Sequence, residues 1–253
     1  MKCRTHGVIV AAALVTAGCA SGSPTPTGSP ASKASVTTSL PSQNVAADKA
    51  LAEAAILKLN DFPTGWTSKP STPSSSNEAT DRQMSACLHT SVPYLELSKT
   101  GPSADSPDFS DSNSNEASNG VTYTASVSQA RKQFAVVQSQ SFPSCYESAI
   151  NTLITSEIQH PSNPSDTLPQ GASVGKTTFQ PMSFPTIGDQ SVAYRVTIPI
   201  TYGGMSVDGQ IDIVASQKGR AIALSEFTAF GTPFDSAMEV QLSTLTASRI
   251  AST

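Results

Sequence analysis

The stretch from Ser191 to Tyr202 alternates apolar and polar side chains with a period of two. Apolar residues occupy its even positions, namely Val192, Tyr194, Val196, Ile198, Ile200 and Tyr202. Alternation of this kind places them on one face of a β-strand. Gly203-Gly204 follows as a two-residue turn, and residues 205–216 repeat the alternation. The sequence therefore predicts a long antiparallel hairpin with one apolar face.

The hairpin continues into a third strand, because Lys218-Gly219 forms another tight turn before residues 220–230. Pro199 lacks a backbone donor, which predicts that the first strand lies at an edge of the sheet or carries a bulge. In the second strand Asp208 and Asp212 point away from the apolar residues. We expect both carboxylates to be solvated.

Helical spacing flanks this sheet on both sides in the sequence. We expect helices at residues 46–59, at residues 128–141, from Cys145 onward and after Pro233. The first of them should end before Pro63, and the second should be broken by Pro143. A further strand is expected at residues 121–125. This order of elements predicts an α+β domain with helices packed on an antiparallel sheet.

Residues 1–18 have the layout of a secretory signal, with positive charge at Lys2 and Arg4, an apolar run from Val8 to Val15 and small residues before Cys19. A cysteine directly after Ala-Gly resembles the lipobox of bacterial lipoproteins, although threonine stands where leucine is usual. The resemblance implies cleavage before Cys19, diacylglycerol on its sulfur and attachment to the outer face of the cell membrane. Cleavage after Ala20, which would release a soluble protein, and an uncleaved membrane anchor are the alternatives.

Residues 19–44 are rich in Ser, Thr, Pro, Ala and Gly, with Lys33 as their only charge. Such a segment cannot bury enough apolar surface to fold, so we expect a disordered spacer. As flexible coil it would hold a domain on the order of 30 Å from the anchor. The chain then divides into a signal peptide (1–18), a lipidated linker (19–44) and one globular domain (45–253).

The four cysteines fit this division. Cys3 is removed with the signal and Cys19 carries lipid, which leaves Cys87 and Cys145 as one pair. In an oxidising compartment we expect them to form a disulfide. The competing roles are poorly supported, because their 58-residue separation is no Cys-x-x-Cys motif and two cysteines alone do not make a zinc site.

Several segments together resemble secreted actinobacterial, especially mycobacterial, lipoproteins. They are ILKLNDFPTGW, VSQARKQFAVVQSQSFPSC, IGDQSVAYRVTIP, QKGRAIALSEF and ASRIAS, within residues 46–251. The resemblance extends to the extracellular sensor domains of mycobacterial Ser/Thr kinases, which usually contain two disulfides. It implies a PsbP/Mog1-like α/β sandwich and a sensor-like, ligand-binding or partner-binding role.

Candidates for catalysis and metal binding are few, and we assign no catalytic, cofactor-binding or metal-binding residue. His89 lies two residues after Cys87, whose thiol the expected disulfide removes, and His160 precedes a proline in a loop. Asp111, Asn113 and Asn115 match three positions of a calcium-binding EF-hand loop, but the glycine and the final glutamate are missing. A polar hairpin loop is the simpler interpretation.

Composition excludes one class of partner. Charged residues make up 13% of the chain and its net charge is −4, so nothing in the sequence resembles a basic nucleic-acid footprint and we expect no nucleic-acid partner. We expect a membrane-anchored module that binds a small apolar ligand between sheet and helix, or an envelope protein. A structural envelope protein and a cell-surface hydrolase are the alternatives.

Overall fold

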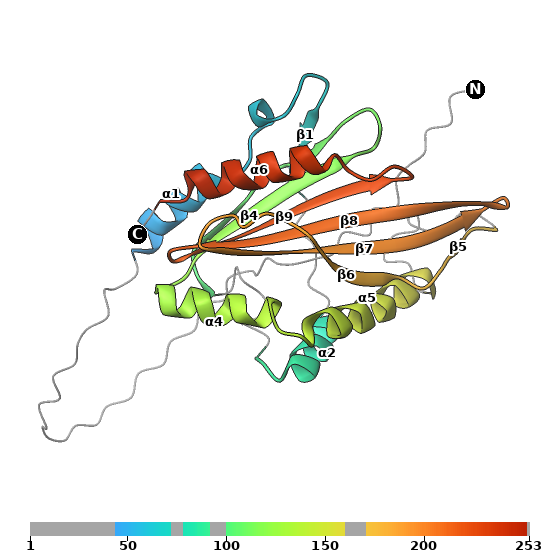
Figure 1. Ribbon diagram of the computed structural model, residues 1–253, viewed down its shortest axis with the longest axis horizontal. Helices are drawn as coiled ribbons and strands as arrows, with labels where there is room; N and C mark the ends of the chain where they lie inside the picture. Colours follow the sequence, from blue (N-terminus) through green and yellow to red (C-terminus); the bar gives the residue numbers. More distant parts are fainter. Residues whose placement is uncertain (1–43, 72–77, 92–99, 160–170, 252–253) are drawn as a thin grey trace, which may run out of the picture.

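The fold is built on the three long strands that the alternating segments predict. The computed structural model describes residues 44–71, 78–91, 100–159 and 171–251. These residues form five α-helices and one nine-stranded sheet whose paired strands are antiparallel, with helices on both faces (Figure 1). The predicted α+β class is therefore confirmed.

The sheet has the order β1-β3-β4-β9-β8-β7-β5, with β2 paired to β4 and β6 paired to β7. Its strands are β1 (Thr67–Lys69), β2 (Ser103–Asp105), β3 (Asp108–Ser110), β4 (Glu116–Tyr123), β5 (Ser173–Val174), β6 (Thr178–Met182), β7 (Gln190–Tyr202), β8 (Met205–Lys218) and β9 (Ala221–Phe230). The long strands β7, β8 and β9 lie in the middle of the sheet, and the short strands lie toward its two edges.

Strand β7 is not an edge strand, because β8 pairs with it on one side and β5 and β6 pair on the other. Pro199 lies between the segments that β5 and β6 cover, and its carbonyl accepts a hydrogen bond from the Gly175 amide at 2.7 Å. The position that cannot donate a hydrogen bond thus coincides with the interruption between two short strands. Pro199 produces a local break in pairing instead of an edge.

The helices are α1 (Val45–Ala55), α2 (Glu78–Leu88), α4 (Val127–Val137), α5 (Phe142–Gln159) and α6 (Ser236–Arg249). Helices α1 and α6 lie on one face of the sheet, and α2, α4 and α5 lie on the other (Figure 1). Each face has its own apolar core. Tyr194 and Ile213 pack with α5, whereas Phe227 and Val214 pack with Leu242 of α6.

Three predicted helix boundaries were wrong, one of them the end of the helix predicted at residues 128–141, since α4 ends at Val137. Helix α1 ends at Ala55, and Leu59 begins a separate 3₁₀ turn, Leu59–Asp61, where its side chain is exposed. Helix α5 begins at Phe142, so Pro143 lies in the first turn of that helix. Proline is tolerated there because first-turn amides have no partner inside the helix. Pro143 thus helps to start α5, instead of merely ending α4.

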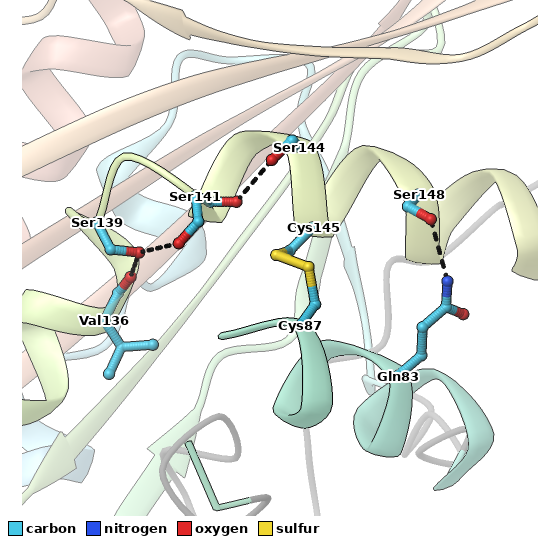
Figure 2. The surroundings of a disulfide bond; sticks show 8 residues. All are labelled: Gln83, Cys87, Val136, Ser139, Ser141, Ser144, Cys145 and Ser148. Atoms are coloured by element: carbon cyan, nitrogen blue, oxygen red, sulfur yellow. Dashed lines mark hydrogen bonds between the residues drawn. A yellow bond between two sulfur atoms is a disulfide. The ribbon is translucent and has the colours of Figure 1, made fainter. Parts of the chain in front are cut away.

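Helix α2 is held to α5 by the disulfide between Cys87 and Cys145 (Figure 2). The Gln83 side chain also donates to the Ser148 hydroxyl on α5 at 3.1 Å. Cys145 is buried in the same apolar core as Met84, whereas Cys87 is exposed. A covalent link therefore joins a helix with few fully buried side chains among its described residues to the layer beneath the sheet.

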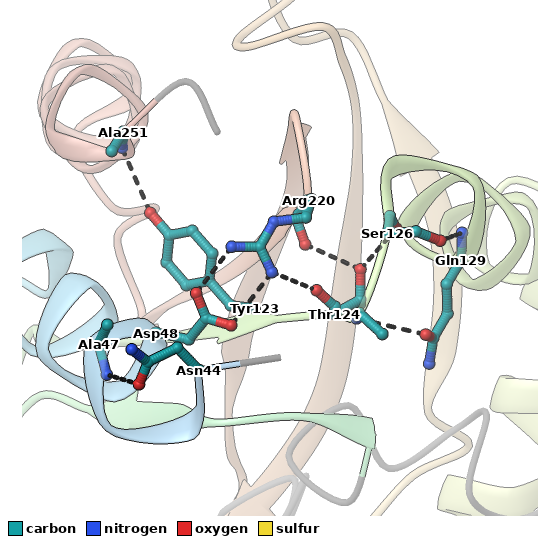
Figure 3. A network of polar contacts seen from close by, with 10 residues as sticks. Asn44, Ala47, Asp48, Tyr123, Thr124, Ser126, Gln129, Arg220 and Ala251 are labelled. Carbon is teal, nitrogen blue, oxygen red and sulfur yellow. Dashed lines mark hydrogen bonds and ion pairs between the residues drawn. The ribbon is translucent and has the colours of Figure 1, made fainter. Parts of the chain in front are cut away.

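The opposite face is fastened by an ion pair between α1 and the turn that joins β8 to β9 (Figure 3). Arg220 donates to both carboxylate oxygens of Asp48, at 3.1 and 2.7 Å, and to the Thr124 carbonyl at 2.8 Å. Its guanidinium also lies 5.6 Å from the centre of the Tyr123 ring, whose hydroxyl accepts from the Ala251 amide. We call these residues the Arg220 clasp. It joins both ends of the described domain to one end of the sheet.

Candidate functional site

Cys19, the predicted lipidation site, lies outside the described residues. So does His160, one of the two histidines considered for catalysis. Cys87 and Cys145 form the predicted disulfide. His89 is exposed and has a positive φ of 51° just after α2. The next amide, that of Thr90, donates back to the Ser85 carbonyl, which is the hydrogen bond of a helix-terminating turn. The geometry gives His89 a role in ending α2.

The Asp111 loop is a tight polar turn between β3 and β4. The Asp111 carboxylate accepts hydrogen bonds from the backbone amides of Asn113 and Asn115, at 2.8 and 3.0 Å. The Asn115 side chain donates to the same carboxylate at 3.0 Å. The Asp111 carboxylate is therefore hydrogen-bonded within the loop itself. This agrees with the interpretation of the segment as a polar hairpin loop.

The prediction that Asp212 is solvated was wrong, although Asp208 is exposed as expected. Asp212 is 1% exposed and accepts two hydrogen bonds from Arg195 on the neighbouring strand, at 2.7 and 2.6 Å. Helix α6 covers this side of the sheet and brings the fully buried Glu239 next to Asp212. The polar face of β8 is therefore buried as well, under α6. The alternation of residues within one strand cannot reveal this, because it does not show what packs on each face.

Asp212 and Glu239 form a buried carboxyl pair with one arginine. Burial raises the pKa of Glu239 to about 8, and the hydrogen bond to Asp212 and the Asp212 charge act in the same direction. Arg195 lowers the same pKa, but not enough to offset these effects. Glu239 is therefore protonated at neutral pH.

Further carboxyl groups lie on the α5 side of the sheet. Burial raises the pKa of Glu226 on β9 to about 7, and the charge of Asp108 raises it further. Burial also raises the pKa values of Asp108 and Glu116. Within the described ranges, no three His, Cys, Asp or Glu side chains come together closely enough to hold a metal ion.

The most exposed apolar group is the tip of the β7–β8 hairpin. Tyr202, Met205 and Val207 are 51%, 74% and 41% exposed. They share the apolar face that the sequence predicts, since Tyr202 pairs with Met205 and Ile200 pairs with Val207. Strand β9 pairs with β8 only from Gly209 onward, so the hairpin extends beyond its neighbour. We call these three side chains the hairpin tip.

Two depressions open onto the surface. The larger has a volume of about 820 Å³ and runs along the outer side of α5, where Lys176 and Glu147 form an ion pair at 2.8 Å. The smaller, about 440 Å³, lies between α1 and β2 and is lined by Lys49, Glu53 and Asp105 among others. Neither lies between the sheet and the helices. In the described part of the molecule, packed side chains occupy those interfaces.

No helix among the described residues is both long enough and apolar enough to cross a bilayer. Comparison with protein-family profiles and with curated proteins finds no match to this chain.

Proposed function

We propose that this chain is a lipoprotein on the extracytoplasmic face of the cell membrane, and that its folded domain binds a partner instead of catalysing a reaction. The observation that carries the binding role is the hairpin tip. Tyr202, Met205 and Val207 form one exposed apolar group on a projecting hairpin. Contiguous apolar groups on a protein surface mark interaction sites more often than isolated ones do.

Anchoring is supported by the cysteine after Ala-Gly and by the disulfide, because disulfides persist in oxidising compartments. The arrangement of the domain also suits a tethered binder. Helix α1 starts beside the β8–β9 turn, whereas the hairpin tip lies at the other end of β8 (Figure 1). A strand of 14 residues spans about 45 Å. The tip is therefore far from the place where the linker would enter the domain.

The kind of partner follows from the packing. A small apolar ligand held between sheet and helix would need a cavity there, but both faces carry packed apolar clusters. A partner that covers the hairpin tip from outside needs no cavity. We therefore favour an envelope protein with an apolar surface over a small enclosed ligand.

Lipid attachment is tested by growing cells with an alkyne-tagged palmitate analogue. We expect label on the wild-type chain and on Cys3→Ser, and no label on Cys19→Ser. Cys3 is the matched control because it precedes the expected cleavage site. Equal labelling of Cys19→Ser would contradict the anchor.

Binding by the tip is tested with a photo-crosslinking amino acid at position 205 in intact cells, and at exposed position 132 on α4 as the control. We expect a product of defined mass from position 205 that is absent from position 132. Adding Tyr202→Ser and Val207→Thr should abolish that product while changing the free energy of unfolding by no more than about 0.5 kcal/mol, because both side chains are exposed. The same products from both positions would contradict the assignment.

A further inference from the structure

We propose that Asp212 and Glu239 share one proton that fastens the N-terminal half of α6 to the sheet, and that loss of this proton releases that half of the helix. Glu239 is fully buried and Asp212 is 1% exposed, yet the one cation beside them in the described residues is Arg195, which forms an ion pair with Asp212. Two adjacent carboxylates with one guanidinium leave an uncompensated buried charge. A proton removes it.

The hydrogen-bonding pattern indicates where that proton lies. Arg195 occupies both oxygens of Asp212. Both oxygens of Glu239 are buried, and no group among the described residues donates a hydrogen bond to either of them. When protonated, Glu239 donates to Asp212, and its buried side chain is no longer unsatisfied. The proton therefore forms the polar link between α6 and β8 at this point.

The charged groups around Glu239 come from three places. Arg195 lies on β7 and Asp212 lies on β8. Asp235 is the N-cap residue of α6. Strand β9 presents the apolar Phe227 to this layer. In α1, Asp48 is already bound by Arg220. The described surroundings thus contain two other acidic groups and one basic group, which favours the neutral form of Glu239.

The two halves of α6 are held differently. In the C-terminal half, Thr246 accepts from the Asn119 side chain, the Ala247 carbonyl accepts from Lys218, and Arg249 forms a double hydrogen bond with Asp61. Near the middle of the helix, one turn after Glu239, the buried Ser243 hydroxyl has no hydrogen-bond partner among the described residues. The side-chain amide oxygen of Gln210, two residues before Asp212 on β8, also has no partner among the described residues. Polar contacts therefore secure one half of α6, and the shared proton secures the other.

Release would uncover an apolar surface. Leu242 of α6 and Phe234, which precedes the helix, pack on Phe227 and Val214 of the sheet. These side chains would become accessible when the N-terminal half of α6 moves away. The C-terminal half would remain in place as the hinge.

The pH dependence has a defined sign. Glu239 in the released helix would have its ordinary pKa of 4.5, whereas in the packed helix its pKa is about 8. The packed form therefore binds more protons between these values and loses stability as pH rises. The equilibrium constant for release should rise about tenfold per pH unit from about pH 5 to about pH 8, and then level off.

Native-state hydrogen exchange on the full chain tests this. Protection factors, corrected for the intrinsic exchange rate, are measured between pH 5 and 9 for the amides of residues 239–243. We expect them to fall about tenfold per pH unit up to about pH 8, while β7 and β8 amides change little. Glu239→Gln, which keeps a donor for Asp212, should make the profile flat. Asp208→Asn, an exposed carboxylate on the same strand, is the control and should behave like the wild type.

A second variant keeps the test decisive if Glu239→Gln folds poorly. Asp212→Asn leaves Arg195 free to pair with an ionised Glu239, so the profile should again be flat. A flat wild-type profile, or an unchanged slope in both variants, would overturn the shared proton. The same slope in α6 and in all sheet amides would overturn local release, because the proton would then act on global unfolding.

Discussion

Replacing both Cys87 and Cys145 with serine is expected to lower the free energy of unfolding by about 4 kcal/mol. The disulfide closes a loop of 58 residues. In the chain-entropy model, a cross-link of this span lowers the entropy of the unfolded chain and so stabilises the fold by roughly that amount. The loss is a large share of the 5–15 kcal/mol typical of domains. Helix α2 packs on α5 and buries few of its own side chains, so we expect it to detach first.

Denaturant titration of the double variant and of the wild type measures this loss. Adding a reducing agent should bring the wild type to the stability of the variant and leave the variant unchanged. The Gln83→Ala variant, which removes a neighbouring α2–α5 hydrogen bond and keeps the disulfide, is the matched control. It should cost about 1 kcal/mol. A double variant that loses no more than this control would refute the expectation.

Replacing Arg220 with methionine is expected to cost about 3–5 kcal/mol, because it leaves the Asp48 carboxylate buried without its cation. It also removes the hydrogen bond to the Thr124 carbonyl and the contact with the Tyr123 ring. Asp48 is buried and Arg220 is half-buried, so solvent screens this pair less than it would a surface pair.

A double-mutant cycle separates the pair from its surroundings. Asp48→Leu together with Arg220→Met should recover most of the loss, since no uncompensated charge remains. Lys176→Met, in the exposed Lys176–Glu147 pair, provides a surface comparison and should change stability by less than about 1 kcal/mol. If Arg220→Met costs no more than Lys176→Met, the Arg220 clasp does not fasten α1 as described.

The central strands could be predicted because their periodicity is long and unbroken. Strands β7, β8 and β9 have 13, 14 and 10 residues, and two glycine-containing turns join them. The short strands β1, β2, β3, β5 and β6 have two to five residues each, too few for a period of two to stand out. Helix α2 was also missed, because Met84 is the only fully buried residue among its described side chains, and one buried residue gives no helical period.

The carboxyl pair could not be predicted, since it depends on which element covers the polar face of β8. Asp212 alternates with apolar residues as a solvent-facing residue would. Glu239 lies one turn after the start of α6, where acidic residues are common in exposed helices. Only the packing of α6 on that face turns two ordinary surface patterns into a buried pair. By contrast, the sequence pattern correctly placed Met205 and Val207 on the apolar face, but it did not reveal that the hairpin extends beyond β9.

The Arg220 clasp has a mechanical consequence. If the chain is anchored as we propose, tension in the linker enters the domain at Asn44 and reaches the sheet through α1. That helix is held by side-chain contacts, whereas β7, β8 and β9 are joined by continuous backbone hydrogen bonds. A pulling force should therefore peel α1 away at the Asp48–Arg220 pair before it shears the strands. Eleven residues would extend the reach of the linker while the hairpin stays folded.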